Sequence, residues 1–208
     1  MSDELVGRTD LVGRTDLVGR NALVLGVERP AGRRAAVALA EAGADVAVVT
    51  LTEETQAEFA ANSTANEFWA LGRRGIALTT DGREGTVAEA IADATAELGP
   101  VSILVWHATH SIAKITGLRS DPAIIVLLAD DAHVEGNRAL MEWTRDLADT
   151  GLRANALITN PALAEAIGPV LKQHHPPTPL DLAQAVAYLA SDASAAIEGA
   201  VVVAADAP

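Results

Sequence analysis

Residues 22–49 read ALVLGVERPAGRRAAVALAEAGADVAVV, in which two apolar runs flank a glycine-containing turn and an alanine-rich segment. The first run, residues 22–25, predicts a buried strand, and the alanine-rich segment predicts a helix that ends near Glu41. Gly43 follows that helix where glycine commonly ends one, and residues 46–49 predict a second buried strand. This order predicts two parallel strands joined by a crossover helix.

The same alternation continues to the end of the chain. Further strands are predicted at residues 75–78, 101–105, 123–128, 153–158 and 200–203. Further helices are predicted at residues 52–71, where Thr52 would be the N-cap, and at 86–98, 133–149 and 179–191. Continuously apolar strands that alternate with helices are typical of a parallel sheet covered on both faces. We therefore predict an α/β fold with a doubly wound, Rossmann-type parallel sheet of about seven strands.

A six-residue repeat precedes the first strand. Leu5-Val-Gly-Arg-Thr-Asp10 recurs as residues 11–16, and Leu17-Val-Gly-Arg20 begins a third copy. Six residues are far fewer than a solenoid unit needs, so a short duplication is the simpler interpretation. Only the third copy leads into a strand. Residues 1–16 are therefore predicted to form an arm or a partner contact, and residues 17–208 the Rossmann-like domain.

Composition and charge exclude several classes of protein. Half of the 208 residues are apolar but few are aromatic, so Ala, Val, Leu and Ile must build the core. A net charge of −13 argues against nucleic-acid binding and against docking on anionic membranes. The absence of cysteine excludes disulfides, zinc-thiolate sites and a cysteine nucleophile. No apolar run approaches a membrane span, and the acidic N-terminus lacks a signal core, so we expect a cytoplasmic protein.

Several landmarks in a fixed order resemble those of a known family. They are Leu23–Gly26 with Gly32, Glu41–Val46, Ile103–Val105, Gly151–Ala156, Tyr188–Asp192 and Gly199. Over about residues 17–207 the chain is similar to the short-chain dehydrogenases/reductases. The resemblance implies an oxidoreductase ancestry and a nicotinamide dinucleotide site at the first glycine-rich turn.

The resemblance assigns the dinucleotide site to Gly26, Arg29, Gly32 and Asp81, the last of which would lie near the adenine. The family's middle glycine is Pro30 here, and proline removes one N–H from a loop that presents such groups to the pyrophosphate. The second strand ends at residues 50–51, Thr and Leu, where an acid would hold the ribose or an arginine a 2′-phosphate. We therefore predict weak NAD(P) binding or none.

The family's catalytic residues have no counterparts in the sequence. A dehydrogenase of this type needs a tyrosine followed four residues later by a lysine, but the single tyrosine, Tyr188, is followed by Asp192. Alignment of the surrounding helix places His133 at the tyrosine position and Asn137 at the lysine position. The serine-bearing loop before His133 is missing. Residues 109–122, which join the fourth and fifth strands, leave room for a short helix at most.

Histidines elsewhere give no metal site. His107 and His110 are predicted in a turn after the fourth strand, without carboxylates in register. A histidine at a helix start with acids before it is more often a capped residue than a general base, and this interpretation applies to His133.

Two functions follow from this sequence. The first is a degenerate family member without hydride transfer, which serves as a structural or regulatory subunit of an oligomer. The alternative is an NAD(P)-dependent oxidoreductase with a site rebuilt around His133.

The assembly of subunits is a further expectation. The resemblance implies oligomers, and the shortened connection before the fifth strand would remove one of the surfaces through which family members associate. We therefore predict a dimer, homomeric or with a complete relative, formed by the apolar stripe of residues 180–189 and the strand at residues 200–204.

Overall fold

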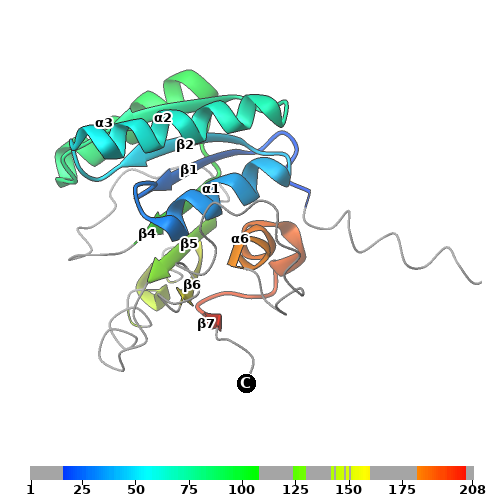
Figure 1. The fold of residues 1–208 in the computed structure, drawn as a ribbon. Helices are drawn as coiled ribbons and strands as arrows, with labels where there is room; N and C mark the ends of the chain where they lie inside the picture. Colours follow the sequence, from blue (N-terminus) through cyan, green and yellow to red (C-terminus); the bar gives the residue numbers. More distant parts are fainter. Residues whose placement is uncertain are drawn as a thin grey trace, which may run out of the picture.

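The computed structural model describes residues 16–107, 124–129, 142, 144–147, 149, 151–159 and 182–204. The strands in these residues are β1 (Asn21–Leu25), β2 (Asp45–Thr50), β3 (Gly75–Thr79), β4 (Ile103–His107), β5 (Ile124–Ala129), β6 (Arg153–Thr159) and β7 (Val201–Ala204). The helices are α1 (Pro30–Glu41), α2 (Thr55–Ala70), α3 (Glu84–Leu98), α6 (Leu182–Ala190) and the short 3-10 helix η3 (Asp192–Ser194). Strands and helices alternate through the amino-terminal half (Figure 1).

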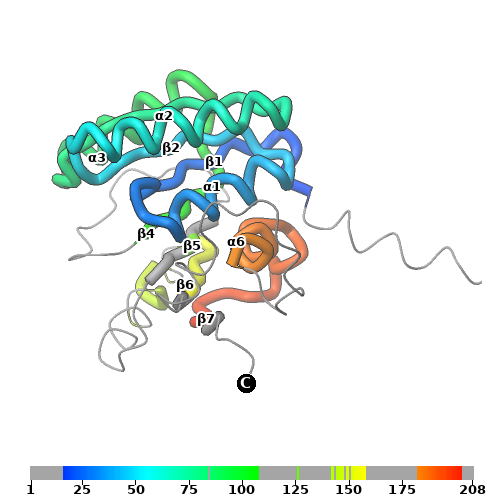
Figure 2. Tube along the Cα trace, viewed as in Figure 1, coloured from blue at the N-terminus to red at the C-terminus, as the bar shows by residue number. Residues whose placement is uncertain are grey.

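All the paired strands are parallel, and they form one sheet in the order β3-β2-β1-β4-β5-β6-β7. The tube in Figure 2 follows the chain outward from β1 to β2 and β3, before α3 leads to β4 on the other side of β1. This arrangement confirms the predicted doubly wound parallel sheet. In such sheets the ligand site lies where the strand order reverses, at the carboxyl ends of β1 and β4.

Alternate residues of β1 enter two separate cores. Ala22 and Val24 pack in a cluster with buried residues of α1, α2 and α6. Leu23 and Leu25 pack in a second cluster with the buried face of α3. Helices thus cover both faces of the sheet, and α1 lies beside α6 on one of them (Figure 1). Both cores consist almost entirely of aliphatic side chains, as the composition predicts.

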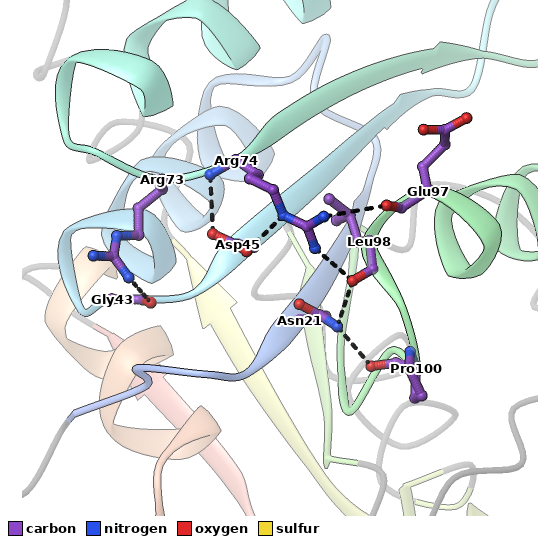
Figure 3. Close-up of polar contacts among 8 residues, drawn as sticks. All are labelled: Asn21, Gly43, Asp45, Arg73, Arg74, Glu97, Leu98 and Pro100. Carbon is purple, nitrogen blue, oxygen red and sulfur yellow. Dashed lines mark hydrogen bonds and ion pairs between the residues drawn. The ribbon is translucent and has the colours of Figure 1, made fainter.

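A polar cluster at the amino edge of the sheet joins β1, β2, β3 and the loop before β4 (Figure 3). The Arg74 backbone N–H and Nε donate to the two carboxylate oxygens of Asp45, each at 2.9 Å. The Arg74 guanidinium also donates to the carbonyl of Leu98, at 2.5 Å. Asn21 Nδ2 donates to the carbonyls of Leu98 and Pro100, at 3.0 and 3.1 Å. The cluster therefore fixes the starts of three neighbouring strands to one another.

The third repeat copy packs onto the same edge. Leu17 is 2% exposed, and its backbone N–H donates to the carbonyl of Ala42 at 2.8 Å. Gly19 has a φ of +80°, a conformation that favours glycine. Arg20 pairs with Asp192 beyond α6 at 3.0 Å. Residues 1–15 lie outside the described residues, and Asp16, the last residue of the second copy, accepts a hydrogen bond from the Val18 N–H through Oδ1 at 2.8 Å.

Two predicted boundaries are wrong. Helix α2 begins at Thr55 with Glu54 as its N-cap residue, because Thr52 remains in the loop and accepts from the Glu54 backbone N–H at 3.4 Å. Strand β4 extends to His107 instead of ending at residue 105, because its pairing with β5 continues through His107 and Leu128.

The apolar stripe of the last helix packs within the chain. Leu182, Val186 and Leu189 of α6 are buried in the cluster that includes α1, so the stripe is used within the chain. Tyr188, on the outer side of this helix, is 39% exposed. Strand β7 lies at the end of the sheet, as the prediction requires. The predicted shortening at residues 109–122 lies outside the described residues.

Candidate functional site

The loop between β1 and α1 is shaped by two glycines. Gly26 has a φ of +89°, and a Cβ added there would lie 2.9 Å from Cβ of His107. A Cβ added at Gly32 would lie 2.2 Å from the carbonyl oxygen of Gly26. Side chains at either position would therefore collide with neighbouring atoms. The structure brings together the two glycines that the sequence assigned to the tight turn.

Helix α1 begins at Pro30, and Arg29 before it has extended backbone and no side-chain capping bond. Proline suits the first position of a helix, where the N–H has no partner within the helix. Arg33 N–H already donates to the Arg29 carbonyl, which leaves Ala31 and Gly32 as the N–H groups of the first turn that face beyond the helix end. The helix start can thus bind an anion, with one donor fewer than a glycine at residue 30 would give.

A cavity of about 600 Å³ lies beside this loop, between the carboxyl end of β2 and the start of α2. Its lining residues are Glu28, Arg29, Leu51, Thr52, Glu54, Gln56, Ala57 and Ala60. Oε2 of Glu28 accepts a hydrogen bond from the backbone N–H of Leu51, at 3.2 Å. The volume falls within the range of small-molecule sites, and the polar groups come from two neighbouring strand ends.

Glu28 is the residue that the sequence analysis missed. One signal could have identified it. Glu28 lies between the two glycines, and a loop at the carboxyl end of β1 must pass near the end of β2, so a polar side chain of this loop could be expected there. The N–H groups of Gly26 and Val27 both donate to the Val49 carbonyl, at 2.9 and 3.3 Å, and so hold the loop over β2. That register brings the Glu28 carboxylate to Leu51.

The basic residues near the loop have different environments. Arg29 lines the cavity and is exposed, so the structure keeps it among the candidate cofactor residues. Arg33 forms an ion pair with Glu67 of α2 on the outer surface. Arg33 is therefore used in a surface ion pair and does not line the cavity.

Asp81 follows β3 and organises the start of α3. Its Oδ1 accepts hydrogen bonds from the Arg83 backbone N–H at 3.0 Å and from Thr86 Oγ1 at 2.6 Å. The Thr86 hydroxyl, followed by the Arg83 N–H, holds the pKa of Asp81 below its ordinary value. A Cβ at the next residue, Gly82, would lie 2.9 Å from the Leu51 carbonyl. The Asp81 loop therefore borders the cavity region, although Asp81 is not among the lining residues.

The histidines and their neighbours are only partly described. His107 lies at the carboxyl end of β4, fully buried beside Gly26, and not in the turn that the sequence predicted. Its placement follows from the continued pairing of β4 with β5. His133, Asn137 and His110 lie outside the described residues. Within the part of the chain that the structure describes, no group of three or more His, Cys, Asp or Glu side chains could hold a metal ion.

None of the described helices combines the length and the apolar character that crossing a bilayer requires.

Solved structures similar to this chain share its fold over nearly their whole length. A hydroxysteroid dehydrogenase from Escherichia coli is 20% identical, with a TM-score of 0.71 over 94% of this chain and 99% of that one. A blue fluorescent protein from a metagenomic library, in complex with NADPH, is 23% identical with a TM-score of 0.69, covering 92% and 98%. A short chain dehydrogenase from Burkholderia cenocepacia, in complex with NADP, is 26% identical with a TM-score of 0.65, covering 90% and 96%.

No curated protein sequence matches the chain significantly. The family model for short chain dehydrogenases matches residues 20–124, just over half of the chain. The match spans the glycine turn, the cavity and β4. The chain therefore belongs to the short chain dehydrogenase family.

Proposed function

We propose that this chain is a short-chain dehydrogenase-type subunit without hydride-transfer activity, which serves as a structural or regulatory part of an oligomer. One observation carries the proposal: the only tyrosine of the chain is Tyr188, and its only lysines are Lys114 and Lys172. The family's tyrosine–lysine pair, which exchanges a proton with the substrate oxygen, therefore has no equivalent anywhere in the sequence.

The position of Tyr188 supports this conclusion. Its carbonyl accepts from Ser191, and Ser191 in turn accepts from Arg153 at the start of β6, at 2.7 Å. Arg20, just before β1, pairs with the neighbouring Asp192. The backbone of the single tyrosine thus lies near the amino edge of the sheet, whereas the glycine turn and the cavity lie at the carboxyl edge.

Binding of NAD(P) is weak or absent in this proposal. A bound nicotinamide nucleotide would supply the hydride acceptor or donor, and the N–H groups at the start of α1 would hold its phosphates. Pro30 cannot donate to them, and Thr50 uses its hydroxyl within the loop, donating to the Thr52 carbonyl at 2.9 Å. Each missing charge-assisted hydrogen bond weakens binding by about 1.5–3 kcal/mol, or about ten- to a hundredfold.

The partner is a second copy or a catalytically complete relative, and it docks at the β7 end of the sheet. Among the described strands β7 pairs only with β6, and an open edge strand favours pairing with another chain. Because the apolar residues of α6 are buried within the chain, the contact from that helix is limited to its outer side, which includes Tyr188. A stable interface there buries at least about 1,200 Å² in total. Sedimentation of the purified protein should show a dimer; a stable tetramer would contradict this assembly.

Calorimetric titration with NAD⁺, NADH, NADP⁺ and NADPH tests the cofactor part of the proposal. We expect dissociation constants no tighter than the millimolar range for the natural chain. The Pro30→Gly variant restores one N–H and should bind about tenfold more tightly, while its turnover remains undetectable. Micromolar binding by the natural chain, with cofactor-dependent turnover that His133→Ala lowers a hundredfold or more, would instead establish the oxidoreductase with a rebuilt site.

A further inference from the structure

The outer face of α2 carries two aromatic side chains that lie in solvent. Phe59 is 78% exposed and Trp69 is 70% exposed, although the whole chain has only six aromatic residues. One exposed apolar side chain needs no explanation, but these two share one helix. They are ten positions apart, which is about 15 Å along a helix axis. Exposed aromatic side chains grouped on one element are typical of a contact surface.

The residues between the two aromatic side chains continue the same face of α2. Five exposed residues follow one another here at intervals of four, three, four and three positions. They are Thr55, Phe59, Asn62, Asn66 and Trp69. Alternation of four and three is the spacing of the seam through which two helices pack in a coiled coil. The opposite face of α2 is buried in the core of the domain, so these five residues, which we call the α2 seam, form a second packing face.

The middle of the α2 seam is polar. Asn62 and Asn66 occupy it, and the Asn62 side-chain nitrogen donates to the Glu58 carbonyl at 3.0 Å. The amide oxygen of Asn62 can accept a further bond from a partner. An amide in such a seam fixes the register of two helices and lowers the stability of their contact. The α2 seam therefore suits a specific but weak association.

The charges at the two ends of α2 favour an antiparallel second copy. Glu54 and Glu58 lie at the amino end of the helix and are exposed. Arg73 follows the carboxyl end, and its bond to the Gly43 carbonyl, at 2.9 Å, does not neutralise its charge. In an antiparallel pair the acidic end of each α2 faces the basic end of the other, and the helix dipoles also attract. A parallel pair would bring like charges together.

The antiparallel arrangement also matches the side chains of the α2 seam. When two copies are centred on Thr64, Phe59 of one copy lies opposite the partner's Trp69. In the same register, Asn62 lies opposite the partner's Asn66, so amide faces amide and ring faces ring. Each match occurs twice. The surface therefore complements itself, as a two-fold interface requires.

We propose that the α2 seam binds a second copy of this chain, antiparallel and in this register. Four aromatic side chains, at about 150–250 Å² each, bury about 600–1,000 Å² in the pair. A stable interface buries about 1,200 Å² or more, so this contact is weak and reversible. Helix α2 packs on β2 and β3, at the end of the sheet opposite β7 (Figure 1). The contact is therefore separate from the assembly in the proposed function and does not depend on it.

Sedimentation velocity of the whole chain, from about 10 μM to about 1 mM, tests the proposal. With rising concentration the natural chain should pass reversibly from its smallest species to larger ones. Trp69→Ser should raise the concentration of half-association at least about tenfold, because it removes two of the four aromatic side chains from the contact. Since Trp69 is exposed, the Tm of this variant should equal that of the natural chain.

Val18→Ser is the matched control, because Val18 is also exposed, at 65%, but lies outside α2. It should leave the concentration of half-association within about twofold. Cross-linking tests the direction of the helices, since the chain contains no cysteine. A mixture of Asn62→Cys and Asn66→Cys should form the mixed disulfide, and either variant alone should form little.

Sedimentation that shows no larger species at about 1 mM would overturn the proposal, as would equal effects of Trp69→Ser and Val18→Ser. Cross-linking of each cysteine variant with itself, in preference to the other variant, would overturn the antiparallel register. A monomer as the smallest species would contradict the assembly at β7, while its association through α2 at higher concentration would still support the contact proposed for α2.

Discussion

At the amino edge of the sheet, charged groups are bound to one another, whereas at the carboxyl edge they face a cavity. Arg74 donates to Asp45 and to the Leu98 carbonyl, and these bonds join the starts of the strands (Figure 3). At the opposite edge, Glu28 makes one contact with Leu51 and lines an open space together with Arg29. The strands thus begin in one kind of environment and finish in another.

The amino edge therefore contributes mainly to the stability of the fold, and the carboxyl edge mainly to ligand binding. Polar groups that satisfy one another hold secondary structure together and leave no donor or acceptor for a ligand. At the carboxyl edge, the close contact between Gly32 and Gly26 brings the start of α1 against the end of β1, and the first N–H groups of α1 have no partner within the helix. Substitutions at the two edges should therefore affect stability and binding in different proportions.

The largest effect is expected at Gly32, where an added Cβ would lie nearer to a neighbouring atom than at Gly26 or Gly82. Gly32→Ala places a Cβ 2.2 Å from the Gly26 carbonyl oxygen, so α1 must move away from β1. We predict a loss of about 3 kcal/mol, which lowers Tm by roughly 6–12 °C. Thermal unfolding measures the effect.

Gly85→Ala is the control for this prediction. Gly85 also lies in a helix, but a Cβ there would have no atom within 4 Å. Since alanine favours helix more than glycine does, Tm should stay constant or rise. Equal destabilisation by the two substitutions would show that helix composition, and not the contact with Gly26, determines the result.

The next largest loss of stability is expected at Leu17, in the third copy of the repeat, which packs at the amino edge. Leu17→Ala removes a side chain that is 2% exposed, and we predict a loss of about 2 kcal/mol, at the low end for a buried leucine because the chain start can relax. Leu11→Ala makes the same change in the preceding copy and should leave Tm unchanged. A comparable loss from Leu11→Ala in thermal unfolding would refute the prediction that residues 1–16 form an arm.

The sequence predicted the sheet well because its signal is local and repeated. Each strand is a short apolar run beside a helix with apolar spacing, so β1, α1 and β2 could be located without knowing their partners. The two glycines were recognised for the same reason. Glu28 was missed because its role depends on the distance to Leu51, which lies 23 positions away along the chain and is set by strand pairing. His107 was misplaced because nothing in β4 alone shows that pairing with β5 continues to its end.

Substitution of Arg74 in the polar cluster at the amino edge should cause a smaller loss of stability. Arg74→Met removes the bonds to Asp45 and Leu98, but the Arg74 side chain is 58% exposed, so the loss should be about 1 kcal/mol. Urea unfolding at neutral pH measures it. Arg83→Met removes a pair with Asp81 in which the arginine is more exposed, so it should change stability less than Arg74→Met does. A larger loss at Arg83 than at Arg74 would reverse the proposed difference between the edges.

The smallest effect is a pH dependence at Asp45. Partial burial acts to raise the pKa of Asp45, but the hydrogen bonds and charge of Arg74 outweigh it and hold that pKa below its ordinary value. A carboxyl whose pKa is lower in the folded state stabilises the protein above its unfolded pKa, and this stabilisation disappears as pH falls through the folded value.

The natural chain should therefore be more stable than Asp45→Asn at neutral pH, and the difference should shrink between about pH 5 and pH 3. Asparagine can still accept from the Arg74 backbone N–H, but its amide NH2 cannot accept from Arg74 Nε, so the variant removes the charge together with that second bond. Asp93→Asn, an exposed change on α3, controls for net charge. Urea unfolding across this pH range gives the result. A difference between the natural chain and Asp45→Asn that stays constant with pH would show that Arg74 stabilises the amino edge through neutral hydrogen bonds, and not through the charge of Asp45.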